Sequence, residues 1–111
     1  MKQITTITND TVQKLRLVGE NNEQIDFKLR YLPSQQAWYF DLSYQGIDID
    51  NMKLVTSPNL LRQWENYLPF GLACLTLDGA DPFFIDDFID ERVQIYLLGE
   101  EDLETVEDLY Y

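Results

Sequence analysis

Acidic side chains in the last third of the chain are the groups with the greatest potential for chemistry. Four carboxylates stand within residues 86–91, and they are Asp86, Asp87, Asp90 and Glu91. Such a cluster could form a catalytic acid and base pair or bind a hard cation such as calcium. The preceding residues 78–82 do not match an EF-hand loop, because their glycine and proline stand at the wrong positions. We therefore interpret the four carboxylates as solvated surface charges.

The other groups that catalysis commonly uses are absent or lack a partner. The chain contains no histidine, which removes the commonest general base and the commonest zinc ligand. Its serines have no histidine to activate them, and its five glycines are too widely spaced to form a phosphate-binding loop. Cys74, the only cysteine, lies in an apolar run without basic neighbours, so we expect a buried and unreactive thiol. We predict no enzyme activity, no cofactor, no metal ion and no small-molecule substrate.

Charge is distributed unevenly along the chain. The 20 acidic and 8 basic residues give a net charge of −12. Twelve of the acidic residues lie between Asp78 and Tyr111, where Arg92 is the only base, so this third of the chain carries a charge of −11. The resulting field repels phosphate backbones, and we expect no nucleic-acid partner. A basic protein surface is the natural complement.

Length and hydropathy indicate one domain without a membrane segment. At 111 residues, of which 45% are apolar, the chain has the size of a single domain with a continuous core. No stretch approaches the roughly 18 consecutive apolar residues of a membrane-spanning helix. The first residues lack the apolar region of a secretory signal, so we expect no membrane partner and no export.

The elements that would position the acidic groups are mainly strands. Residues 25–31 alternate between apolar and charged side chains, which is typical of a strand with one wet face. Residues 38–45 repeat this pattern after a short loop that contains proline, so the two segments should pair as an antiparallel hairpin. Residues 13–18 supply a third strand of the same meander.

Three further strands are expected downstream. Residues 47–56 alternate again, and we expect a bulge at Asn51. Residues 70–77 form a strongly apolar strand that ends in a turn. Residues 93–98 are apolar on both faces, which indicates a central position in a sheet or a covered outer face.

Together these segments predict a mainly β fold. We expect a small single-domain antiparallel β-barrel or sandwich of about six or seven strands. One or two short helical turns complete it, the first of them at residues 60–64. We assign residues 1–99 to the β-barrel-like domain and residues 100–111 to an acidic C-terminal tail or short helix, because the apolar residues of the tail have helical spacing.

Contacts with other proteins are expected from aromatic and acidic side chains outside the strands. Trp38 is in phase with Phe40 and belongs to the core, whereas Trp64 lies in a less regular region and is the better contact residue. Residues 83–89 do not alternate, and their apolar side chains indicate a knob that packs against the body of the protein or against a partner. The candidate contact residues are Trp64, Phe83, Phe84, Asp86, Asp87, Glu100, Glu101, Asp102, Tyr110 and Tyr111.

Five segments and Gly46 carry a family resemblance. The segments are QKLRL at residues 13–17, QIDFKLRY at 24–31, AWYFDL at 37–42, LVTSPNLL at 54–61 and DDFIDERVQIYL at 86–97. Their order, over roughly residues 10–98, resembles the phage baseplate plug family, small proteins at the centre of contractile-tail baseplates. The resemblance implies a β-barrel-like virion subunit, made in the host cytoplasm, near the junction of tail tube and central hub or spike. It implies several copies, contacts with those tail proteins and with copies of itself, and no catalytic residues.

Our first hypothesis is therefore a virion structural protein of a contractile phage tail. Two other classes stay open. The acidic last third is compatible with an acidic interaction module, such as an inhibitor or nucleic-acid mimic that binds a basic nuclease or DNA-binding protein. The carboxylates are also compatible with a hydrolase or a metal-dependent enzyme.

Overall fold

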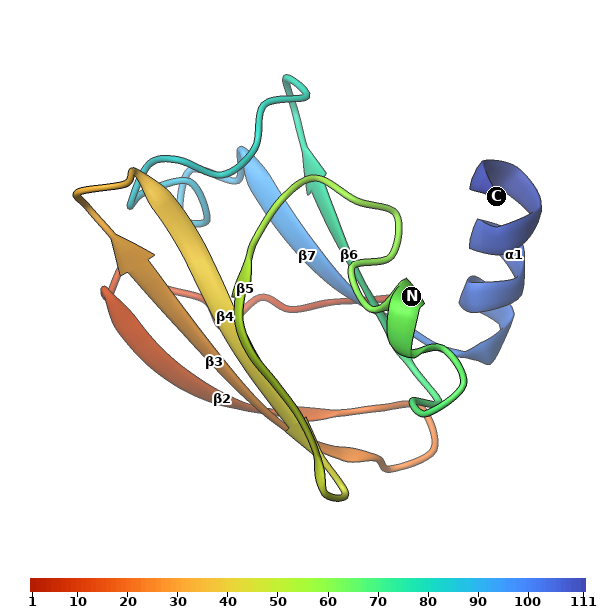
Figure 1. The fold of residues 1–111 in the computed structure, drawn as a ribbon. Helices are drawn as coiled ribbons and strands as arrows, with labels where there is room; N and C mark the ends of the chain where they lie inside the picture. The colour runs from red at the N-terminus through yellow and green to blue at the C-terminus, as the bar shows by residue number, and fades with distance from the viewer.

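The computed structural model describes all residues, 1–111, and contains two antiparallel sheets with a helix at one side (Figure 1). The strand order is β2-β3-β4-β5 in the first sheet and β1-β7-β6 in the second. The seven strands and the low helical content confirm the predicted mainly β class. In chain order the elements are β1 (Lys2–Gln3), β2 (Val12–Val18), β3 (Gln24–Leu32), β4 (Ala37–Tyr44), β5 (Ile47–Lys53), η1 (Arg62–Trp64), β6 (Gly71–Thr76), β7 (Val93–Leu98) and α1 (Glu100–Tyr110).

Alternating side chains build the four-stranded sheet. Along β3, Ile25, Phe27 and Leu29 are buried, whereas Asp26 between them is exposed. Successive residues of a strand point to opposite faces of the sheet, so this alternation turns one apolar face toward the second sheet. Phe27 lies opposite Leu42 of β4 in the antiparallel register, and both side chains are buried. The meander therefore forms as the sequence predicts.

The bulge expected at Asn51 is present in β5. The pairing of β4 with β5 shifts register at this point, and Asn51 adopts a φ of 57°. Asparagine tolerates this left-handed conformation better than most residues. Asp41 accepts a hydrogen bond of 2.6 Å from the backbone N–H of Asn51, which holds the bulge in place. The strand ends at Lys53, earlier than the expected end at Thr56.

The second sheet has β7 at its centre, in agreement with the apolar character of both faces of that strand. The outer edge of β6 is covered by the chain that follows β5. Ser57 and Cys74 exchange two backbone hydrogen bonds of 3.0 and 2.9 Å, and the N–H of Leu60 donates to the carbonyl of Leu72 at 2.7 Å. This segment therefore joins the two sheets. The short strand β1, which pairs with β7, was not expected from the sequence.

One core of 19 buried apolar residues lies between the sheets. Trp38 is fully buried, and the centre of its ring lies 5.0 Å from that of Phe88. Each large apolar side chain buried in this way contributes about 1.5–3 kcal/mol to stability. Cys74 is buried as expected, and burial raises the pKa of its thiol to about 12. Neither η1 nor α1 has the length and apolar surface of a membrane-spanning helix.

Candidate functional site

Nine of the ten candidate contact residues, all except Trp64, lie in two segments at opposite ends of the β6–β7 pair (Figure 1). The loop that joins β6 to β7 leaves one end of the pair, and α1 follows β7 at the other end. We call residues 83–89 of the loop the knob. The knob contains Phe83, Phe84, Asp86 and Asp87, whereas α1 and the residue after it contain Glu100, Glu101, Asp102, Tyr110 and Tyr111.

Hydrogen bonds with buried and half-buried side chains fix the knob. The carboxylate of Asp87 accepts the backbone N–H groups of Phe83 and Phe84, both at 2.8 Å. Two aromatic side chains from the four-stranded sheet bind the carbonyls of the same residues. Tyr31 Oη donates to the carbonyl of Phe83 at 2.8 Å, and Trp38 Nε1 donates to that of Phe84 at 3.0 Å. The C=O groups of Phe83 and Phe84 are therefore tied to the four-stranded sheet, and their N–H groups are bound by the buried Asp87 within the knob.

Arg92 organises the rest of this loop. Its guanidinium binds Asp87 through Nε at 2.8 Å and Nη2 at 2.7 Å, and Asp78 through Nη1 at 2.7 Å. It also donates to the carbonyls of Ala80 and Asp81, each at 3.1 Å. Two parallel hydrogen bonds to one carboxylate make the Arg92–Asp87 contact a strong ion pair.

The environment of Asp87 corrects its assignment as a solvated surface charge. Its side chain is only 3% exposed. Burial alone would raise the pKa of this carboxyl, but hydrogen bonds from Arg92 and from the amides of Phe84 and Phe83 outweigh burial and lower the pKa. The hydrogen bonds to Asp87 and, to a smaller extent, to Asp78 in turn raise the pKa of Arg92. The hydrogen-bond partners of the Asp87 side chain all lie within five residues of it. Its burial was not predicted, because the loop is held against the core by Tyr31 and Trp38 of the other sheet.

Some apolar side chains of the knob are buried in the core, and others are exposed to solvent. Phe88 is buried against Trp38, whereas Phe84 is 55% and Ile89 is 50% exposed. Phe83 is half-buried, with its ring 4.2 Å from that of Phe84 and 4.5 Å from the guanidinium carbon of Arg92. The knob thus packs partly on its own body and presents two apolar side chains on a fixed backbone.

The acidic first turn of α1 is also held by the body of the protein. Asp102 accepts the N–H of Gly99 at 3.0 Å and pairs with the amino group of Met1 at 2.6 Å. Burial acts to raise the pKa of Asp102, but the amino group and the Gly99 amide lower it overall. Glu100 and Glu101 are exposed in the same turn, where the positive end of the helix dipole stabilises acidic side chains.

The far end of α1 contacts η1 through a single base. Arg62 donates to Glu107 at 3.2 Å, and its guanidinium carbon lies 3.8 Å from the centre of the Tyr111 ring. Tyr110 and Tyr111 are both exposed. Trp64, in the same short helix as Arg62, is half-buried against the core, so it offers only part of its surface to a partner.

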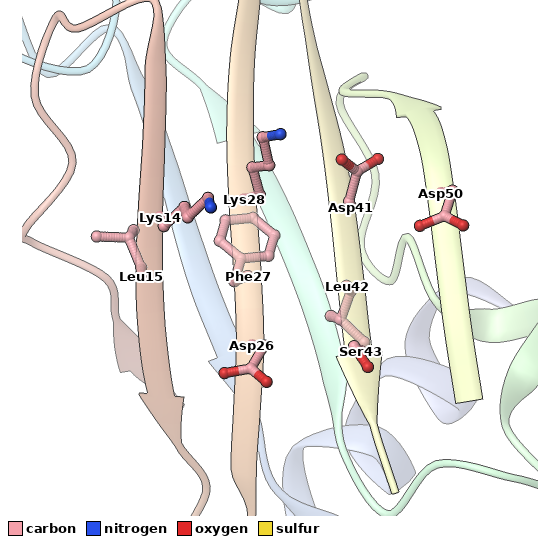
Figure 2. A pocket seen from close by; sticks show the side chains of 9 residues that line it. All are labelled: Lys14, Leu15, Asp26, Phe27, Lys28, Asp41, Leu42, Ser43 and Asp50. Carbon is pink, nitrogen blue, oxygen red and sulfur yellow. The ribbon is translucent and has the colours of Figure 1, made fainter. Parts of the chain in front are cut away.

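A hollow on the outer face of the four-stranded sheet is the other feature that invites a chemical interpretation (Figure 2). Lys14 and Lys28 lie side by side on β2 and β3, and Asp41 and Asp50 stand on the next two strands. Two positive side chains on β2 and β3 therefore lie beside two negative ones on β4 and β5, and Asp41 is already bound to Arg30 at 3.1 Å. No group of three or more acidic or thiol side chains is placed to hold a metal ion. We assign no catalytic role to this surface.

Two functional features escaped the sequence analysis. Arg92 was counted only as the single base among twelve acids, although its isolation is the signal that could have identified it as an ion-pair centre. The packing of α1 against the outer face of the three-stranded sheet also escaped, because it depends on contacts between distant segments.

A known protein family matches most of the chain. Residues 1–101 match a family model described as cyanophage baseplate Pam3 plug gp18. The match spans both sheets and the knob and ends just after the start of α1. No curated protein matches the chain.

Proposed function

The chain belongs to the cyanophage baseplate Pam3 plug gp18 family, and we propose that it links the tail tube to the central hub or spike of a contractile tail through protein–protein contacts. Family membership itself indicates a structural role in the tail baseplate, contacts with other baseplate proteins, and a protein that is not an enzyme. The contacts with tube, hub or spike, the presence of several copies and synthesis in the host cytoplasm are parts of the proposal.

The family match over residues 1–101 is the observation that carries this proposal. The structure adds support in the form of the knob. Protein–protein contacts are strongest where large apolar side chains are presented on a backbone that loses little freedom on binding. Phe84 meets this description, since its carbonyl accepts a hydrogen bond from Trp38 and its N–H donates one to Asp87. Ile89 is a second exposed apolar side chain of the same knob.

Quantitative mass spectrometry of purified tails, from the phage that encodes this chain, tests the proposal. We expect the chain in a fixed ratio to the tail-tube and hub proteins of intact particles. A Phe84→Ser chain should be incorporated less well than the wild type, because it loses an apolar contact. Tyr67→Ser, which changes another exposed aromatic residue outside the knob, is the matched control. Absence of the wild-type chain from intact tails would refute the proposal.

A further inference from the structure

A groove separates α1 from the outer face of the three-stranded sheet. It has a volume of about 190 Å³, and most of the residues around it are hydrophobic. Leu75 and Leu98 form the sheet wall, and Val106 and Leu109 form the helix wall. Leu98 is buried, but Leu75 is 43% and Leu109 is 71% exposed. Exposed apolar side chains gathered around one groove mark a place where another molecule packs.

The outward face of α1 beside this groove is acidic and lacks partners within the chain. Glu101, Glu104 and Asp108 are spaced at i, i+3 and i+7, so they share one face of the helix. All three are exposed, and none forms an ion pair. Their mutual repulsion destabilises the helix. Asp108 also stands near the negative end of the helix dipole, in a last turn that contains no base.

We propose that this groove binds a segment of a neighbouring protein in which a large apolar side chain is flanked by lysine or arginine. The apolar side chain enters the groove, and the cations face Glu101, Glu104 and Asp108. The proposal names the chemistry of a partner and rests on the baseplate role proposed above. It goes beyond the family comparison, since that match ends at residue 101.

The size of the groove favours a protein segment over a small ligand. Pockets for small molecules typically have volumes of about 300–1,000 Å³, whereas this groove has about 190 Å³. A slot of this size suits one or two side chains. Its position beside an acidic helix face then selects for positive charge next to them.

A second copy of the chain is a less suitable occupant than a basic partner. Each copy has a net charge of −12, so two copies repel one another. The four arginines of the chain are already paired within it, so a second copy could offer only its four lysines to the acidic face. A separate basic protein has neither disadvantage.

Calorimetry with synthetic peptides tests the site on the full chain. The probe is an amphipathic peptide with leucines on one face and lysines on the other, and its control carries glutamates in place of the lysines. We expect the lysine peptide to bind and the glutamate peptide not to bind. Raising the ionic strength from about 0.1 M to about 1 M should weaken binding, because the screening length falls from about 10 Å to about 3 Å.

Two neighbouring leucines provide matched variants. Leu75→Ser removes an apolar wall of the groove and should weaken peptide binding by about tenfold or more. Leu77→Ser changes a more exposed leucine of the same segment outside the groove, and its affinity should equal that of the wild type. Circular dichroism confirms that both variants are folded. Combining Glu104→Gln with Asp108→Asn should weaken binding a few-fold and reduce its salt dependence.

Four results would overturn the inference. The first is that the lysine peptide does not bind, and the second is that the glutamate peptide binds equally well. The third is that the Leu75→Ser and Leu77→Ser chains bind the lysine peptide with equal affinity. The fourth is that the wild-type chain self-associates and that Leu75→Ser abolishes this self-association. The last result would assign the groove to a second copy. Incorporation into phage tails separates this inference from the baseplate role. Tails that contain wild-type and Leu75→Ser chains equally would refute the groove partner alone, whereas tails without the wild-type chain would refute the baseplate role.

Discussion

The loop between β6 and β7 and the helix α1 contain equal numbers of acidic residues, six each, but use them differently. In the loop, four of the six carboxylates accept hydrogen bonds from within the chain. In α1, two of the six do so. The bonded carboxylates are Asp78, Asp81, Asp86 and Asp87 in the loop and Asp102 and Glu107 in α1.

Arg92 accounts for much of this difference. It lies inside the acidic loop, where it binds two carboxylates and two carbonyls and turns the loop inward. Helix α1 contains no basic residue, and its two ion pairs are formed with Arg62 of η1 and with the amino group of Met1. Equal acidity along the sequence therefore gives mostly bonded carboxylates in the loop and mostly unpaired surface charge in α1. The net charge of a segment does not tell how much of that charge a partner can reach.

The largest effect is expected from Arg92→Ala. This change leaves Asp87 buried without its cation, and breaking a buried pair typically costs about 3–5 kcal/mol. Such a loss is a large part of the 5–15 kcal/mol that usually stabilises a domain. Arg16→Ala is the control, because Arg16 and Asp26 form an exposed pair that contributes about 1 kcal/mol or less. Urea unfolding followed by tryptophan fluorescence measures both. Equal losses would mean that the loop depends on Arg92 no more than the sheet surface depends on Arg16.

Acid should weaken the loop through Asp87. The pKa of Asp87 in the folded protein lies below its ordinary value of about 3.9. Its ionised form is therefore favoured by folding, and this stabilisation is complete above about pH 5 and is lost as the pH falls through the folded pKa. The Asp87→Asn chain should be less stable at pH 7 and should lose less of its remaining stability on acidification. Unfolding free energies measured from pH 7 downward test this. Parallel curves for the two chains would show that Asp87 does not contribute to the pH dependence.

The smallest effect is expected in α1. Glu104→Ala removes repulsion with Asp108 four residues later, and alanine is a better helix former. The unfolding free energy should stay the same or rise by up to about 0.5 kcal/mol, and amide hydrogen exchange in α1 should slow slightly. A clear loss of stability would show that Glu104 has a partner within the folded chain. The carboxylates of α1 would then be bonded within the chain as those of the loop are.

The sequence predicted the sheets well because their causes are local. Alternation along β3 and β4 follows directly from the two-residue repeat of a strand, and the bulge at Asn51 follows from a residue that tolerates positive φ. β7 is central because both of its faces are apolar. β1 was missed because two residues, Lys2 and Gln3, are too few to show a repeat.

The candidate site was less predictable because its causes are long-range. Arg92 lies only five residues from Asp87, but the loop that buries Asp87 is held by Tyr31 and Trp38 of the other sheet. The burial of Phe88 and the exposure of Phe84 depend on the same contacts with Tyr31 and Trp38. No pattern within residues 83–89 tells which of the two phenylalanines is buried. The acidic, helical character of the segment after Gly99 could be inferred from its composition and spacing, but the groove beside it could not.

A density map of the intact baseplate, from tails of the phage that encodes this chain, would test both the structural role and the partner of the groove. We predict that the chain lies at the centre of the baseplate, with a segment of a neighbouring protein seated between α1 and β6 and basic side chains facing Glu101, Glu104 and Asp108. A map in which the chain is present but this groove faces solvent would contradict the predicted partner. A complete baseplate that lacks the chain would contradict the structural role itself.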